Sequence, residues 1–210
     1  MELDLAQLLP RPLGSAETGD AVTVLCDAFR NYPVMRYVLG PRDGYERRLH
    51  TFIGFFVTAR VLRNELVLGI PDTDGTLVAA ALVSLPGEGP VPEALATRRE
   101  AVWVELGTAE RERYERFGLA SAQFGVDCPH YYLDLIGVRR SHMGRGLGRK
   151  LLELVHELSD SDARSCGVAL STETRHNLPL YQHFGYRLLG HAQVSEELET
   201  WAFFRRAVTR

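Results

Sequence analysis

Apolar side chains recur at helical spacing in two segments of the first third of the chain. Residues 15–29 and 42–62 each place their apolar positions three or four apart, which predicts two helices. The first helix is expected to stop at Tyr32-Pro33, because the residue before a proline avoids the helical conformation. Ahead of it, 3–9 is predicted as a short strand and 10–14 as a turn.

The middle of the chain combines a hairpin with a charged helical segment. Apolar runs at 66–70 and 76–85 flank Asp72-Thr73-Asp74-Gly75, a hairpin signal because glycine supplies a positive φ. Residues 93–124 are predicted to be helical, with a break at Gly107. The alternating Arg and Glu side chains of this segment predict an exposed face with surface ion pairs.

Strand and helix patterns alternate in the last third. The predicted strands are 131–138, 168–171, 186–194 and 200–206, and the predicted helices are 144–158 and 178–184. An antiparallel first half followed by alternating strands and helices favours an α/β fold with a mixed sheet. No linker is long enough to divide the chain, so residues 1–210 are expected to form a single domain.

Composition narrows the class of protein. The hydrophobic content of 45% and charged content of 24% are those of a globular protein, and a net charge of −3 gives no general attraction to nucleic acid. The sequence lacks a signal-peptide pattern and any apolar run near the roughly 20 residues that span a bilayer. Its 3 widely spaced cysteines argue against a disulfide framework and for a reducing compartment, hence a cytoplasmic protein. No His, Cys and carboxylate cluster has the spacing of a metal site.

The most informative motif is the glycine run Gly144-Arg145-Gly146-Leu147-Gly148 at the start of a predicted helix. Glycines let the backbone approach a ligand closely, and the first N–H groups of a helix attract anions. A dinucleotide-binding motif would need G-x-G-x-x-G, and a P-loop would need Ser or Thr after Lys150. A turn that only packs the helix against a strand is the structural alternative.

The motif resembles the cofactor motif of the GCN5-related N-acetyltransferase (GNAT) superfamily, because Met143-x-x-Gly146-x-Gly148 follows a strand and opens a Leu-rich helix. Downstream, the segment from Leu170 to Tyr186 resembles the superfamily's second signature, with Asn177, Tyr181 and a closing Phe-Gly-Tyr. Ala28-Phe29-Arg30-Asn31-Tyr32-Pro33 and Thr200-Trp201 are similar to puromycin N-acetyltransferase-like members. Met143 departs from the Gln or Arg usual in the family.

The resemblance implies a GNAT fold, with a mostly antiparallel sheet of about six to seven strands splayed at its middle and flanked by helices. It also implies acetyl-CoA as cofactor, with the pyrophosphate at the glycine run and the pantetheine arm along the preceding strand. The residues implied to bind it are Ile136, Gly137, Val138, Met143, Gly144, Arg145, Gly146, Leu147, Gly148, Arg149, Asn177 and Tyr181.

Two residues are implied to carry the chemistry. Tyr181 matches the family's general acid, and its ordinary pKa of about 10 makes it a hydrogen-bond donor to the departing sulfur. Asp134 interrupts an apolar strand and matches the proposed base of polyamine acetyltransferases; a hydrogen bond to loop backbone is the alternative role. Asn177 is expected both to cap the following short helix and to contact the cofactor.

The implied acceptor is a primary amine of a small, partly hydrophobic molecule. The loop after the first helix and the second helix build that site in the family. The expected lining residues are therefore Phe29, Tyr32, Met35, Arg36 and Tyr132, joined by the 86–128 segment. A protein or peptide N-acetyltransferase and a non-catalytic acyl-CoA-binding module are the alternatives. The acceptor, the acyl-chain preference and the oligomeric state are not specified by the sequence, and a homodimer stays open.

Overall fold

The computed structural model describes residues 8–87 and 89–208, which fold around one mixed sheet. Its strands are β1 (Arg11–Pro12), β2 (Leu66–Pro71), β3 (Leu77–Ser84), β4 (Tyr131–Val138), β5 (Gly167–Thr172), β6 (Arg187–Ser195) and β7 (Leu198–Arg206). They lie in the order β1-β2-β3-β4-β5-β7-β6. Only the central pair, β4 and β5, is parallel. The predicted mixed, mostly antiparallel sheet is therefore confirmed.

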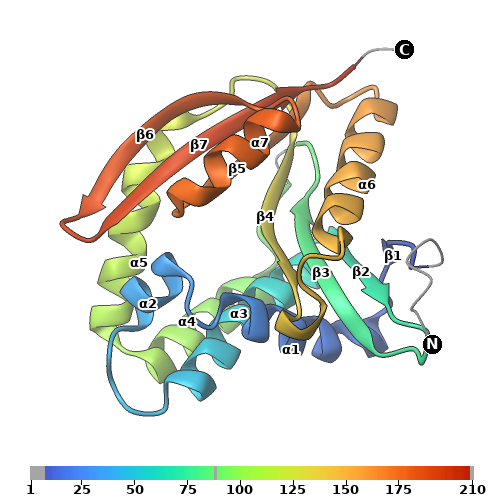
Figure 1. The fold of residues 1–210 in the computed structure, drawn as a ribbon. Helices are drawn as coiled ribbons and strands as arrows, with labels where there is room; N and C mark the ends of the chain where they lie inside the picture. The colour runs from blue at the N-terminus through green and yellow to red at the C-terminus, as the bar shows by residue number, and fades with distance from the viewer. Residues whose placement is uncertain (1–7, 88, 209–210) are drawn as a thin grey trace.

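Helices cover both faces of the sheet (Figure 1). They are α1 (Thr18–Phe29), α2 (Pro33–Leu39), α3 (Tyr45–Leu62), α4 (Glu93–Leu106), α5 (Thr108–Ser121), α6 (Leu147–Ser161) and α7 (Leu178–His183). Helices α1 to α4 pack one hydrophobic core against β3, while α6 packs a second core against the opposite face. The alternation of side chains along β3 produces this division, since Ala80 and Leu82 join the first core and Ala79 and Ala81 the second.

Most predicted elements are confirmed, with three corrections. The strand expected at 3–9 lies largely outside the described residues, and β1 instead falls within the predicted turn, where it pairs with β2. Pro33 ends α1 but also begins α2, a helix the sequence analysis did not predict, because proline is well tolerated in a first helical turn. Helix α6 begins three residues later than predicted, after two glycines with positive φ.

The cysteine interpretation was wrong. Cys128 and Cys166 form a disulfide, and Cys26 is the free thiol. Since β4 and β5 run parallel from neighbouring starts, the residues just before them lie together, and the Cys166 N–H donates to the Pro129 carbonyl at 2.8 Å. The odd number of cysteines concealed this pair. No helix within the described ranges is long and apolar enough to cross a membrane.

Candidate active site

The parallel pair β4–β5 opens in the middle of the sheet. The two strands are paired only from Tyr131–Leu133 to Val168–Leu170. On the other side of β4, the register with β3 shifts so that Leu133 and Leu135 face consecutive β3 residues and Asp134 is the extra residue of a bulge. The bulge and the divergence leave a gap between the strands, and two cavities meet there.

The larger cavity, of about 860 Å³, lies beside the glycine run. It is lined by every predicted cofactor residue except Arg145, together with residues of α1 and α7. Gly144 and Gly146 have φ of 76° and 73°, a conformation that favours glycine, and a Cβ on either would point into open space. The 15-residue helix α6 then begins at Leu147, so its first N–H groups lie at the cavity.

Arg149 and Met143, two of the predicted cofactor residues, line this cavity in different surroundings. Arg149 lines it, but its guanidinium is shared with Glu153 at 2.7 Å and lies over the Phe184 ring at 5.8 Å. Met143 lines it too and is 66% exposed. Backbone N–H groups and the α6 dipole are therefore the features of this cavity that attract an anion, together with Arg140, which also lines it.

The smaller cavity, of about 200 Å³, lies on the other side of the gap. The structure brings four of the predicted acceptor residues into its wall: Phe29, Tyr32, Met35 and Tyr132. Arg36 is not in the wall; it donates to Asn31 and stacks over the Tyr45 ring at 3.8 Å.

The second helix and the 86–128 segment contribute to the wall as expected, although their residues were not singled out: Phe52 and Phe56 of α3, and Tyr114 and Phe117 of α5. Glu173, just after β5, was not expected in the wall. The aromatic residues occupy core-like positions on helices, so their spacing does not distinguish a cavity wall from ordinary packing. Glu173 lies within the segment from Leu170 to Tyr186, but no neighbouring residue marks it as part of a cavity wall.

Five residues line both cavities: Phe29, Tyr32, Ile136, Asn177 and Tyr181. They come from α1, the loop before α2, β4, and the start and middle of α7. Two ligands, one in each cavity, would therefore meet at these five residues, which we call the junction.

Asp134 lies in the wall of the smaller cavity, and its 21% side-chain exposure opens into it. Its Oδ2 accepts hydrogen bonds from the Arg60 guanidinium at 2.9 Å and from Ser84 Oγ at 3.0 Å. Burial raises the pKa of Asp134 to about 6, against the opposing effect of the Arg60 charge. A carboxyl with this pKa is ionised at pH 7 and able to take a proton.

Tyr181 is 7% exposed, and its ring packs against Tyr186 and Phe203 at 5.7 and 5.8 Å. Burial raises its pKa above the ordinary value, and the charges of Tyr32 and Glu173 raise it further. Tyr181 therefore stays protonated at neutral pH and keeps a hydroxyl hydrogen that it can donate at the junction.

Asn177 does not cap α7, which corrects one expectation. It occupies the N-cap position, but its side chain makes no capping bond and donates instead to Thr172 Oγ1 at 3.0 Å. Because Thr172 ends β5, this bond ties the start of α7 to the diverging strand.

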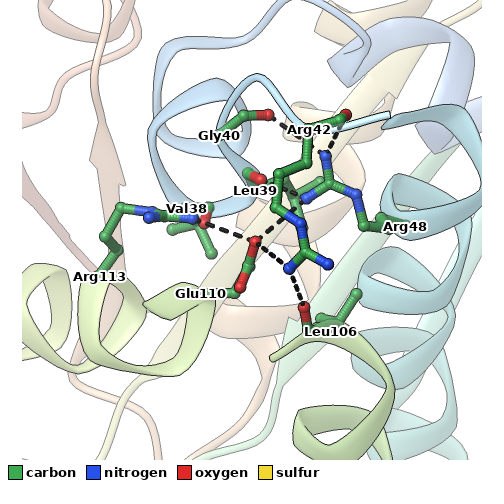
Figure 2. A network of polar contacts seen from close by, with 8 residues as sticks. All are labelled: Val38, Leu39, Gly40, Arg42, Arg48, Leu106, Glu110 and Arg113. Carbon is green, nitrogen blue, oxygen red and sulfur yellow. Dashed lines mark hydrogen bonds and ion pairs between the residues drawn. The ribbon is translucent and has the colours of Figure 1, made fainter. Parts of the chain in front are cut away.

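A charge cluster around the buried Glu110 holds α5 against α2 and α3 (Figure 2). Glu110 is 0% exposed, and its Oε1 lies 3.3–3.4 Å from three guanidinium groups, those of Arg42, Arg48 and Arg113. Arg48 also donates to the carbonyls of Leu39 and Arg42, at the end of α2. The prediction of a wholly exposed face over this segment is therefore wrong at Glu110. The cluster fixes the helix that carries Tyr114 and Phe117 into the cavity wall.

Comparisons with known proteins agree with this geometry. Residues 98–188 match the family model described as acetyltransferase (GNAT) domain. An uncharacterized N-acetyltransferase of Schizosaccharomyces pombe is 26% identical over 178 residues, covering 79% of this chain and 69% of its own.

Two solved structures share the fold. A protein from Corynebacterium glutamicum, described as histone acetyltransferase HPA2 and related acetyltransferase, is 20% identical with a TM-score of 0.72, covering 96% of this chain and 97% of its own. The Drosophila melanogaster polyamine N-acetyltransferase, which forms N-acetylagmatine, is 18% identical with a TM-score of 0.66, covering 95% and 100%. Residues 98–188 thus match a GNAT acetyltransferase domain, and the chain shares the overall fold of these two acetyltransferase structures.

Proposed function

We propose that the chain transfers an acetyl group from acetyl-CoA directly to the primary amine of a small molecule, with both substrates bound at once. The observation that carries this proposal is the junction, where one set of five residues borders both cavities. Direct transfer needs the thioester and the amine within about 3–3.5 Å of each other, and the junction is where they can meet.

The larger cavity suits the pyrophosphate and pantetheine arm of acetyl-CoA. Open space over Gly144 and Gly146 and the N-terminus of α6 offer backbone donors to the pyrophosphate, with Arg149 at the rim. The backbone of Ile136 to Val138 borders the same cavity and is proposed to lie along the arm. Acetyl-CoA supplies an activated acyl group; binding and orienting it is the work of this cavity.

Proton transfer is assigned to groups in the smaller cavity. A lysine-like amine is neutral in only about one molecule in a few thousand at pH 7, so a base is needed. Asp134 is proposed to accept a proton from the amine through water, because its side chain is short and held by Arg60. Tyr181 is proposed to donate a hydrogen bond to the departing sulfur.

A small amine fits the acceptor cavity better than a folded protein surface does. The cavity holds about 200 Å³ and has a mostly aromatic and apolar wall. The two structural neighbours include a polyamine acetyltransferase and a histone acetyltransferase relative, so a peptide amine is the second candidate.

The cofactor site is tested by a substitution that adds charge without strain. Gly148 is the second residue of α6, and a Cβ there would make only an ordinary 3.7 Å contact with Val138. Asp at this position favours the helix, yet places a negative charge beside the pyrophosphate. Calorimetric titration with acetyl-CoA should show at least tenfold weaker binding for Gly148→Asp than for Gly148→Asn. Equal affinities, with wild-type melting temperatures, would exclude this cavity as the pyrophosphate site.

The acceptor class is tested by thiol release with 2-phenylethylamine, agmatine and a histone-tail peptide. We expect turnover with one or both small amines and none with the peptide. Modification of the peptide alone would overturn the small-molecule assignment while leaving the acetyltransferase assignment intact.

A further inference from the structure

The smaller cavity holds a second buried carboxyl besides Asp134. Glu173 lies just after β5, is 9% exposed and lines the wall. Asp134 is paired with a guanidinium, whereas Glu173 has no ion pair with any described cation; the nearby Arg175 is engaged with Glu199 at 2.7 Å. A carboxyl buried without a cation destabilises the fold, which makes a functional role worth considering.

Hydroxyl groups surround Glu173. Thr200 Oγ1 donates to Glu173 Oε1 at 2.9 Å. The Glu173 backbone N–H donates to the Tyr32 hydroxyl at 3.1 Å, so Tyr32 is held against this residue. Tyr32 is also a junction residue, so the hydroxyl that the Glu173 backbone holds lies at the point where the amine must react.

The hydrogen-bond partners around Tyr32 allow its hydroxyl to act as a proton relay. Asn177 donates to Thr172 Oγ1, and Thr172 Oγ1 lies 2.9 Å from the Tyr32 hydroxyl. If Thr172 accepts from Asn177 and donates to Tyr32, the Tyr32 oxygen accepts from Thr172 and from the Glu173 N–H. Its own hydrogen is then directed away from both, toward the carboxyl or the cavity.

We propose that Glu173 takes the proton that the acceptor ammonium loses before attack, with the Tyr32 hydroxyl as relay. This rests on the proposed function and adds to it.

Tyr32 gives its proton to Glu173 and takes one from the ammonium. The freed nitrogen lone pair forms the C–N bond and the C–S bond breaks. The second nitrogen proton passes through water to Asp134. The departing thiolate accepts a hydrogen bond from Tyr181 and takes its proton from solvent. Both carboxyls return their protons to solvent, so one proton is released per turnover.

The electrostatics agree with this order of transfer. Burial raises the pKa of Glu173 to about 7, while hydrogen bonds from Thr200, Tyr32 and Ser171 lower it in part. Glu173, which is not paired with a guanidinium as Asp134 is, therefore binds a proton near neutral pH and suits the first proton. The titratable groups facing it are Tyr32 on the loop before α2, Tyr132 of β4 and Tyr181 of α7, all with pKa values raised by burial and therefore neutral at pH 7.

The test uses acceptors that differ in whether they need deprotonation. The probes are 2-phenylethylamine, an ammonium at pH 7, and 2,2-difluoro-2-phenylethylamine, whose fluorines lower the basicity of the nitrogen. We expect Glu173→Gln to lower kcat/KM for the first at least 100-fold and for the second less than fivefold. The acid limb of the pH profile near 7 should vanish in the variant. Tyr32→Phe should lose activity in the same pattern, because it keeps the ring and removes the relay hydroxyl.

Controls separate this result from misfolding and from failure of the proposed function. Glu115→Gln makes the same chemical change on the surface of α5, where Glu115 is 57% exposed, and should match wild type. Acetyl-CoA affinity of Glu173→Gln should stay within twofold of wild type. Equal losses for both amines, or no loss for either, would overturn the relay. Wild type that binds acetyl-CoA but acetylates neither amine would instead refute the proposed small-amine activity.

Discussion

The Arg60 guanidinium lies 2.9 Å from the Asp134 carboxylate in the wall of the acceptor cavity. Burial nevertheless raises the pKa of Asp134 to about 6, so desolvation outweighs the attraction of the cation. We predict a second acid limb near pH 6 in the kcat profile, since activity is lost as pH falls and Asp134 becomes protonated. Asp134→Asn should lower kcat at least tenfold and remove this limb. Arg60→Gln should move it to higher pH, and a limb that does not move would mean that another group titrates there.

Tyr181 gives a prediction that separates catalysis from binding. Tyr181→Phe keeps the ring packed against Tyr186 and Phe203 and removes only the hydroxyl. Turnover should fall at least tenfold, while the calorimetric Kd for acetyl-CoA stays within twofold of wild type. The matched control is Tyr186→Phe, which removes a hydroxyl bonded to His156 at 3.0 Å outside both cavities. It should cost about 1 kcal/mol of stability and leave turnover near wild type. Unchanged turnover in Tyr181→Phe would remove this residue from the mechanism.

The Glu110 cluster predicts a variant that damages the acceptor site from a distance. Glu110→Gln leaves the buried guanidinium of Arg48 without its counter-charge, which costs about 3–5 kcal/mol when a buried pair is broken. Helix α5 should loosen, so KM for the amine should rise severalfold with little change in acetyl-CoA affinity. Urea unfolding and steady-state kinetics test this beside Glu115→Gln on the same helix. A change in acetyl-CoA affinity alone would contradict the assignment of α5 to the acceptor wall.

The sequence predicted the wall of the larger cavity better than the wall of the smaller one. Glycines at 144 and 146 are diagnostic because the loop needs a positive φ there, and backbone requirements are visible in residue type. Tyr114 and Glu173 reach the cavity only through tertiary packing, and no local pattern distinguishes them from core or surface residues. The same limit applies to Glu110, whose burial depends on three arginines from two other segments and its own helix.

The sheet topology also determines which cysteines form the disulfide. Cys128 and Cys166 are 38 residues apart, and only the parallel pairing of β4 with β5 brings them together. Counting cysteines could not show this, because strand order is a global property of the sheet. The bulge at Asp134 could not be predicted from the sequence either, because it is defined by the register of β4 with β3.

Glu173 leads to a final prediction that needs no substrate. Its folded-state pKa of about 7 exceeds the ordinary 4.5, so the folded protein binds this proton more tightly than the unfolded chain does. The stabilising effect is present below about pH 4.5 and is lost as pH rises through 7. At pH 8 the ionised carboxyl then costs up to about 3 kcal/mol, and Glu173→Gln, which keeps the shape without the charge, should be more stable than wild type. Urea unfolding at pH 5 and pH 8 should show this gain chiefly at the higher pH, with Glu115→Gln unchanged at both. A gain over wild type that is the same at the two pH values would show that Glu173 is not held ionised in the cavity at a cost, and would contradict its role as a base.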